Sequence, residues 1–83
     1  MKYDTIETIA QLDELILAKT DRINALNRMI IDARRRYATM TDAQLNEAVR
    51  DVAGMKREIS EHNAWIEKAQ ARIAKFYAPA TAA

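Results

Sequence analysis

The side chains best suited to chemistry lie in one short segment around His62, the single histidine of the chain. Glu58 precedes it by four residues, which places both side chains on one face of a helix. Glu61 and Ser60 are close in sequence but point to other faces. A zinc site needs three or four ligands, and a nucleophile needs a base within hydrogen-bonding reach. The segment supplies neither, so we expect no catalytic residue, no metal and no cofactor.

Composition narrows the function classes further. The 83-residue chain has no cysteine, so thiolate nucleophiles, thiolate metal ligands and disulfides are excluded. Its 13 basic and 12 acidic residues give a net charge of +1, with no overall bias toward nucleic acid or membranes. The longest apolar run, residues 15–18, is too short to cross a bilayer, and residues 1–10 lack the apolar core of a signal peptide. We therefore expect a cytoplasmic protein with no membrane contact.

The elements that position these residues are expected to be long helices. One glycine and one proline in the whole chain disfavour the turn-rich folds of sheets. Asp4, with Glu7 three residues later, is typical of a helix start. Isoleucines then recur every seven residues from Ile9 to Ile30, and a second series follows three residues behind: Leu12, Lys19, Leu26 and Ala33. This a/d heptad pattern predicts a helix over about 5–37.

A second helix start follows at once. Thr41 and Gln44 have the spacing of a capping box, and Met40 with Leu45 supplies the apolar pair that flanks one. We predict a turn over about 38–41, a second helix over about 42–78 that Pro79 ends, and a flexible tail over 79–83. The heptad seam of the second helix comprises Leu45, Ala48, Val52, Met55, Ile59, His62, Ile66, Ala69, Ile73 and Phe76.

Two helices joined by a short turn must pack antiparallel. If facing seam positions sum to about 78, the two seams match along their length, as in Leu26 with Val52. The same register sets Arg22 opposite Glu58. The sequence thus predicts one all-α domain over 1–78, an antiparallel coiled-coil hairpin of two long helices that dimerises into a helical bundle. One bent helix paired with a second chain would use the same seam.

Two polar residues interrupt this seam. Lys19 and His62 fall in adjacent layers, so their side-chain ends are expected to approach one another. We interpret them as a polar layer that fixes the helix register at some cost in stability. The alternative is a pH-sensitive or ligand-binding spot built on His62.

Basic residues gather near the end of the first helix. Residues 19–36 hold six basic and two acidic residues, whereas residues 1–18 hold one basic and four acidic ones. Cations suit the C-terminal end of a helix, and they would also suit an acidic protein partner. Nucleic acid is the least favoured partner, because no aromatic residue interleaves with the arginines and the acidic segment would repel phosphate. The predicted basic patch is Arg28, Arg34, Arg35 and Arg36.

The first helix carries more apolar residues than its seam uses. Leu15 and Met29 lie on one side of the seam, and Ile6, Leu17 and Ile31 lie on the other. A two-helix hairpin cannot bury both sides, and surplus apolar surface usually marks an interface. Trp65 of the second helix is expected across from Leu15 and is a residue type enriched at binding hot spots. The predicted partner or dimer interface is Ile6, Leu15, Leu17, Met29, Ile31 and Trp65.

These observations favour a non-enzymatic protein–protein interaction module. Our leading hypothesis is a small phage or mobile-element protein that binds and inhibits a host protein by helix-in-groove contact. A self-assembling coiled-coil structural subunit, or a secretion-type co-chaperone, is the first alternative. A nucleic-acid binder that uses the arginine cluster is the second. No residue pattern identifies a family, so these hypotheses rest on the architecture alone.

Overall fold

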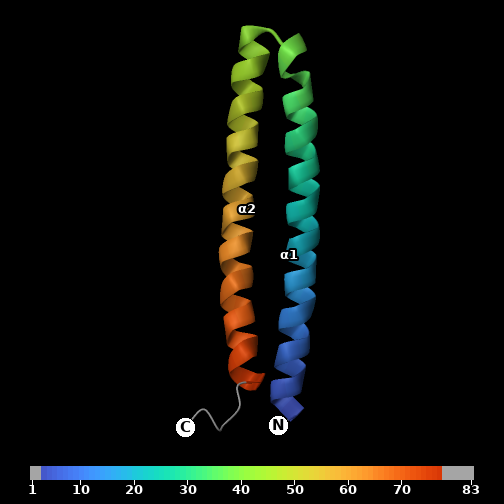
Figure 1. Cartoon of the computed structure of the whole chain (residues 1–83), viewed down its shortest axis with the longest axis vertical. Helices are drawn as coiled ribbons and strands as arrows, with labels where there is room; N and C mark the ends of the chain where they lie inside the picture. The colour runs from blue at the N-terminus through green and yellow to red at the C-terminus, as the bar shows by residue number, and fades with distance from the viewer. Residues whose placement is uncertain (1–2, 78–83) are drawn as a thin grey trace.

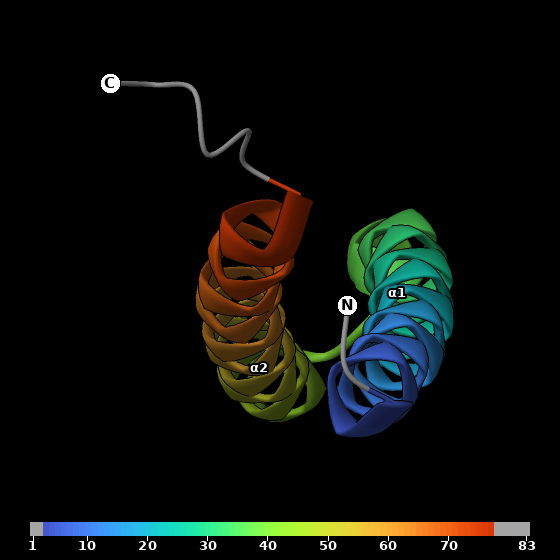
Figure 2. The same ribbon diagram turned by 90° about the horizontal axis from the view of Figure 1, so that it is seen from below.

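The computed structural model describes residues 3–77, with side chains from residue 8 onward. Helix α1 runs over Tyr3–Arg36, a short 3₁₀ helix η1 over Tyr37–Thr39, and helix α2 over Asp42–Tyr77. The two long helices lie side by side and antiparallel, as the views from the side and along the long axis show (Figures 1 and 2). The described part contains no strand. The predicted all-α antiparallel hairpin is therefore confirmed.

The helix ends differ from the prediction by one or two residues. α1 begins at Tyr3 and so includes Asp4, which was predicted to precede the helix as its cap. The side chains of Asp4 and Glu7, and the tail predicted over 79–83, lie outside the part that the structure describes. α1 ends at Arg36, one residue early, because the chain tightens into η1.

The turn is held by the capping box that the sequence predicted. The backbone N–H of Thr41 donates to Gln44 Oε1 at 3.1 Å, and the backbone N–H of Gln44 donates to Thr41 Oγ1 at 3.3 Å. Met40 has extended backbone and donates its N–H to the Tyr37 carbonyl at 3.2 Å. These bonds satisfy backbone groups that a helix end leaves without partners, which fixes where α2 begins.

The heptad positions form the helix–helix seam. From Ile9 to Ile73, every residue of the two predicted series is buried or half-buried. Phe76, the last residue of the second series, is 36% exposed, and its facing position on α1 lies outside the described residues. Phe76 lies one residue before the end of α2.

The core is thin and divided. Its buried members among the described residues are Ile9 and Ala69 toward the open end, and Leu26, Ile30 and Val52 toward the turn. The half-buried Lys19 and His62 separate these two groups. The chain exposes 6594 Å², whereas a globular protein of 9.5 kDa would expose about 5000 Å². The hairpin thus leaves a large surface available to partners.

Candidate protein-binding surfaces

A chain of polar contacts crosses the seam near the middle of the hairpin. Arg22 donates from Nε to Glu58 Oε2 at 2.8 Å and from Nη2 to Oε1 at 3.4 Å. His62 Nε2 lies 3.0 Å from the same Glu58 Oε2, and Lys19 Nζ lies 3.5 Å from His62 Nδ1. The predicted approach of Arg22 to Glu58, and of Lys19 to His62, is confirmed.

The hydrogen-bond chemistry assigns the proton on His62. Lysine can only donate, so Nδ1 must accept from Lys19 and Nε2 must carry the proton donated to Glu58. The hydrogen bond from Arg22, and then that from His62, holds the pKa of Glu58 below its ordinary value. Since both ring nitrogens have partners inside the hairpin, the geometry supports the interpretation of this layer as a register-fixing element.

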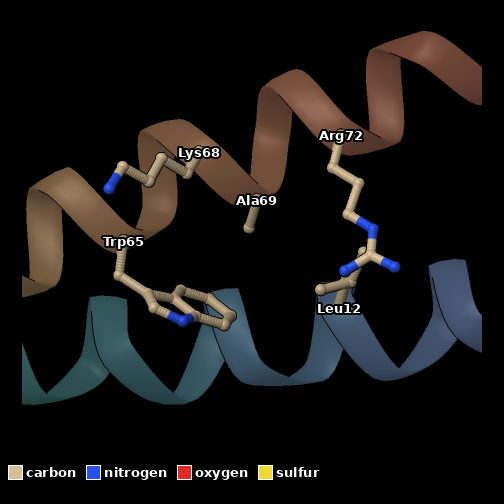
Figure 3. Close-up of a pocket in the computed structure, with 5 residues that line it drawn as sticks. All are labelled: Leu12, Trp65, Lys68, Ala69 and Arg72. Atoms are coloured by element: carbon tan, nitrogen blue, oxygen red, sulfur yellow. The ribbon is translucent and has the colours of Figure 1, made fainter.

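Trp65 continues this polar chain toward the open end. Lys19 Nζ lies 4.9 Å from the centroid of the Trp65 ring, within the range of a cation–π contact. The indole also forms one wall of a shallow hollow of about 180 Å³. The residues that line the hollow are Leu12, Trp65, Lys68, Ala69 and Arg72 (Figure 3).

The hollow combines an apolar floor with a cationic rim. Leu12 and Ala69 lie across from one another, the indole points toward α1, and the Arg72 side chain reaches toward Leu12 (Figure 3). Lys68 adds a second cation to the lining. Such a lining suits an apolar side chain that has a carboxylate beside it, because arginine and lysine form charge-assisted hydrogen bonds with carboxylates.

Exposed apolar residues of α1 extend this hollow along one flank of the hairpin. Leu15 and Met29 are 49% and 45% exposed. They lie seven residues to either side of Arg22, in the heptad row that carries the ion pair to Glu58. We call the hollow together with Leu15 and Met29 the Trp flank.

Of the other predicted interface residues, Leu17 and Ile31 are 63% and 50% exposed. Trp65 is half-buried, and the side chain of Ile6 lies outside the described part. The four exposed residues of the predicted interface are thus available to a partner: Leu15, Leu17, Met29 and Ile31. Their role as an interface stays a prediction. Sequence reasoning missed the exposed Val49 and Tyr77, and also the cationic rim of the hollow.

The predicted basic patch is divided between two faces. Arg28, Arg34, Arg35 and Arg36 are all exposed, and none forms an ion pair with another residue of the described range 8–77. Arg36 shares the heptad row of Leu15 and Met29. The other three arginines lie on the outward side of α1, where acidic residues share the surface. That mixture of signs does not favour a nucleic-acid backbone.

Neither long helix, over its described residues, has a stretch apolar enough to cross a membrane. In the same part of the chain, no three side chains of the histidine, cysteine, aspartate or glutamate type converge as a metal site would need. No protein-family model matches the sequence, and neither the curated proteins nor the solved structures include one that is detectably similar to it.

Proposed function

We propose that this hairpin is a non-enzymatic protein-binding module that docks an acidic amphipathic helix of a partner along the Trp flank. The observation that carries the proposal is the apolar hollow at Trp65, with Lys68 and Arg72 in its lining and exposed leucine and methionine side chains beyond it. Apolar contacts would supply the affinity, and the cations would select a partner with carboxylates beside its apolar residues.

The length of the flank fits a helical ligand. Leu15 and Met29 are fourteen residues apart, which is about 21 Å along a helix axis or four turns. Arg36 lies at the turn end of this flank, and Arg72 lies in the hollow toward its open end. Arg72 reaches toward Leu12, which precedes Arg36 by 24 residues, or about 36 Å along a helix axis. A partner helix of between six and seven turns, with carboxylates near both ends, would therefore match this charge distribution.

We place this binding in the cytoplasm. The more specific hypothesis is that the hairpin is an inhibitor of the protein that it binds. In this hypothesis, the hairpin of a phage or mobile element covers a functional groove of a host protein. A saturating amount of the hairpin would then lower the activity of that host protein.

The test uses paired variants of equal apolar loss. Leu15→Ser with Met29→Ser removes the exposed part of the Trp flank, and Leu17→Ser with Ile31→Ser removes equivalent residues from the other side of α1. Each tagged variant is used to capture proteins from host cells, and the captured partner is then purified. We expect the first variant to lose binding and the second to retain it. Retention by the first, in a protein that is helical by circular dichroism, would contradict the proposal.

A spectroscopic measurement identifies the docking site independently. Trp65 is the single tryptophan of the chain, so its fluorescence reports the hollow without labelling. The purified partner is added and its own fluorescence is subtracted. The emission of Trp65 should then shift to shorter wavelength, because the partner displaces water from the indole. Lys68→Glu with Arg72→Glu should weaken this binding at least tenfold and reduce its dependence on salt. An unchanged emission spectrum at saturation would place the partner elsewhere.

A further inference from the structure

The side of α1 that faces away from both α2 and the Trp flank has an ordered charge pattern. Leu17 and Ile31 lie on it, each seven residues from Asn24, and all three side chains are exposed. In the rows beside them, the acidic residues precede Asn24 and the basic residues follow it: Asp13, Glu14 and Asp21, then Arg28, Arg34 and Arg35. We call these nine residues the outer face.

The charges of the outer face have no partners within the hairpin. All six charged side chains are exposed, and none forms an ion pair with another residue of the described range 8–77. Leu17, at 63% exposed, is the most exposed leucine of that range. Within the isolated hairpin, the basic residues in the last turn of α1 suit the helix macrodipole, but no ion pair among the described residues uses the order of these charges.

The outer face is complementary to the outer face of a second copy that runs in the opposite direction and is centred on the same Asn24. Suppose that a second copy packs antiparallel with its Asn24 facing Asn24. Two residues of the two copies then lie at the same height when their numbers add up to 48, so Leu17 lies opposite Ile31 of the other copy. In a twofold antiparallel pair, each flanking row meets the same row of the other copy. Every charge then lies within one residue of an opposite charge, about 1.5 Å along the axis: Asp13 with Arg34, Glu14 with Arg35, and Asp21 with Arg28.

The exposed area is sufficient for such a contact. The chain exposes 6594 Å², about 1500 Å² more than a globular protein of its mass. A standard protein interface removes about 800 Å² from each partner. A surplus of this size is larger than one contact of standard size.

We propose that the outer face binds a second copy of this chain, in an antiparallel twofold dimer centred on Asn24. The apolar contacts are Leu17 with Ile31 of the other copy, and the twofold axis repeats each ion pair. Because the same patch is used on both copies, the contact closes on itself and gives a dimer, not a filament. The Trp flank lies on the opposite side of α1, so the dimer would keep both of its partner-binding flanks open.

Charge reversal tests the pairing directly. Asp13→Arg with Glu14→Arg makes both ends of the outer face basic, and Arg34→Glu with Arg35→Glu makes both ends acidic. Each variant alone sets like charges against one another, so we expect its dimer dissociation constant to rise at least tenfold. An equimolar mixture pairs opposite charges at every contact, so it should recover a dimer that contains one copy of each variant. Sedimentation equilibrium measures all three states.

A matched control separates the pairing from net charge. Arg50→Glu with Arg57→Glu makes the same change at exposed positions of α2 and should leave the dimer unchanged. If the mixture of the two outer-face variants stays monomeric although both are helical by circular dichroism, the proposed contact is wrong. A wild-type chain that remains monomeric up to millimolar concentration would overturn it equally.

Disulfide crosslinking tests the position of the twofold axis independently of charge. The chain has no cysteine, so an introduced cysteine is the single thiol of each variant. A twofold axis at Asn24 brings this residue next to its own copy, so Asn24→Cys should form a crosslinked dimer in a glutathione buffer. Ser60→Cys, at the corresponding heptad position of α2, is the control and should stay uncrosslinked under the same conditions. If the two variants crosslink equally, or Ser60→Cys crosslinks faster, Asn24 is not at the dimer axis.

Discussion

Replacing His62 by leucine is expected to leave the stability of the hairpin nearly unchanged, because the burial gain and the lost hydrogen bonds nearly cancel. Complete burial of a leucine side chain contributes about 1.5–3 kcal/mol, and the His62 side chain is 20% exposed, so about four-fifths of that gain is available at this position. The cost is the loss of two hydrogen bonds, of which the one to Lys19 is long at 3.5 Å. A typical net value is about 1 kcal/mol per hydrogen bond, and Glu58 keeps its bond to Arg22.

Four-fifths of the burial gain is about 1.2–2.4 kcal/mol, and the two lost hydrogen bonds cost about 1–2 kcal/mol. The free energy of unfolding should therefore change by no more than about 1 kcal/mol, which shifts the melting temperature of a domain of this size by at most about 4–8 °C. Thermal unfolding followed by circular dichroism at neutral pH measures this shift, at several protein concentrations so that association is separated from folding. Met55→Leu, in the same heptad row, is the control: it exchanges apolar side chains of similar volume and should change stability by less than about 1.5 kcal/mol. A loss of more than about 1 kcal/mol in His62→Leu would show that the polar layer holds the hairpin together, against our interpretation.

Three further predictions follow from burial, capping and charge. Leu26→Ala should cost about 3–4 kcal/mol in urea unfolding, because Leu26 is 1% exposed and its removal leaves a cavity; a cost below about 1 kcal/mol would mean that the seam collapses around the site. Thr41→Ala should cost about 1 kcal/mol, because it removes the hydrogen bond to the Gln44 backbone; an unchanged stability would show that the capping box does not hold the turn. Because the pKa of Glu58 is lowered in the folded state, its stabilising contribution is present above the ordinary glutamate pKa of 4.5 and is lost as the pH falls through the lower folded value. Wild-type protein should therefore lose more stability between pH 6 and pH 3 than Glu58→Gln does, and equal losses would contradict this assignment.

Most of the fold could be predicted because heptad spacing and register are properties of the chain alone. Once Ile9 to Ile30 fix one seam and Thr41 fixes the start of the second helix, an antiparallel register follows. Arg22 and Glu58 then meet without further information. The partial exposure of Phe76 could not be predicted, because a heptad pattern gives the spacing of a seam and not the exposure of its last position.

The hollow could not be predicted, because it depends on a side-chain conformation and on residues at three different heptad positions of the two helices. Lys68 and Arg72 are not a run of cations like Arg34–Arg36. They become a cationic rim only because the Trp65 indole and Leu12 lie between the helices at their level. The order of charges on the outer face was visible in the sequence, but its significance appears only when the exposed side of α1 is known.

The division of the core by Lys19 and His62 has a consequence for how the molecule opens. The half near the turn holds Leu26, Ile30 and Val52, and its ends are tied by the capped connection. The other half holds Ile9 and Ala69 and has no covalent link at its open end. Local unfolding should therefore begin there and stop at the polar layer, so that backbone amides exchange with deuterium faster in the open half. The hollow lies in that half, so a ligand that docks there would also stabilise the packing of the two helices against one another. Part of its binding free energy would then offset the cost of ordering this half of the hairpin.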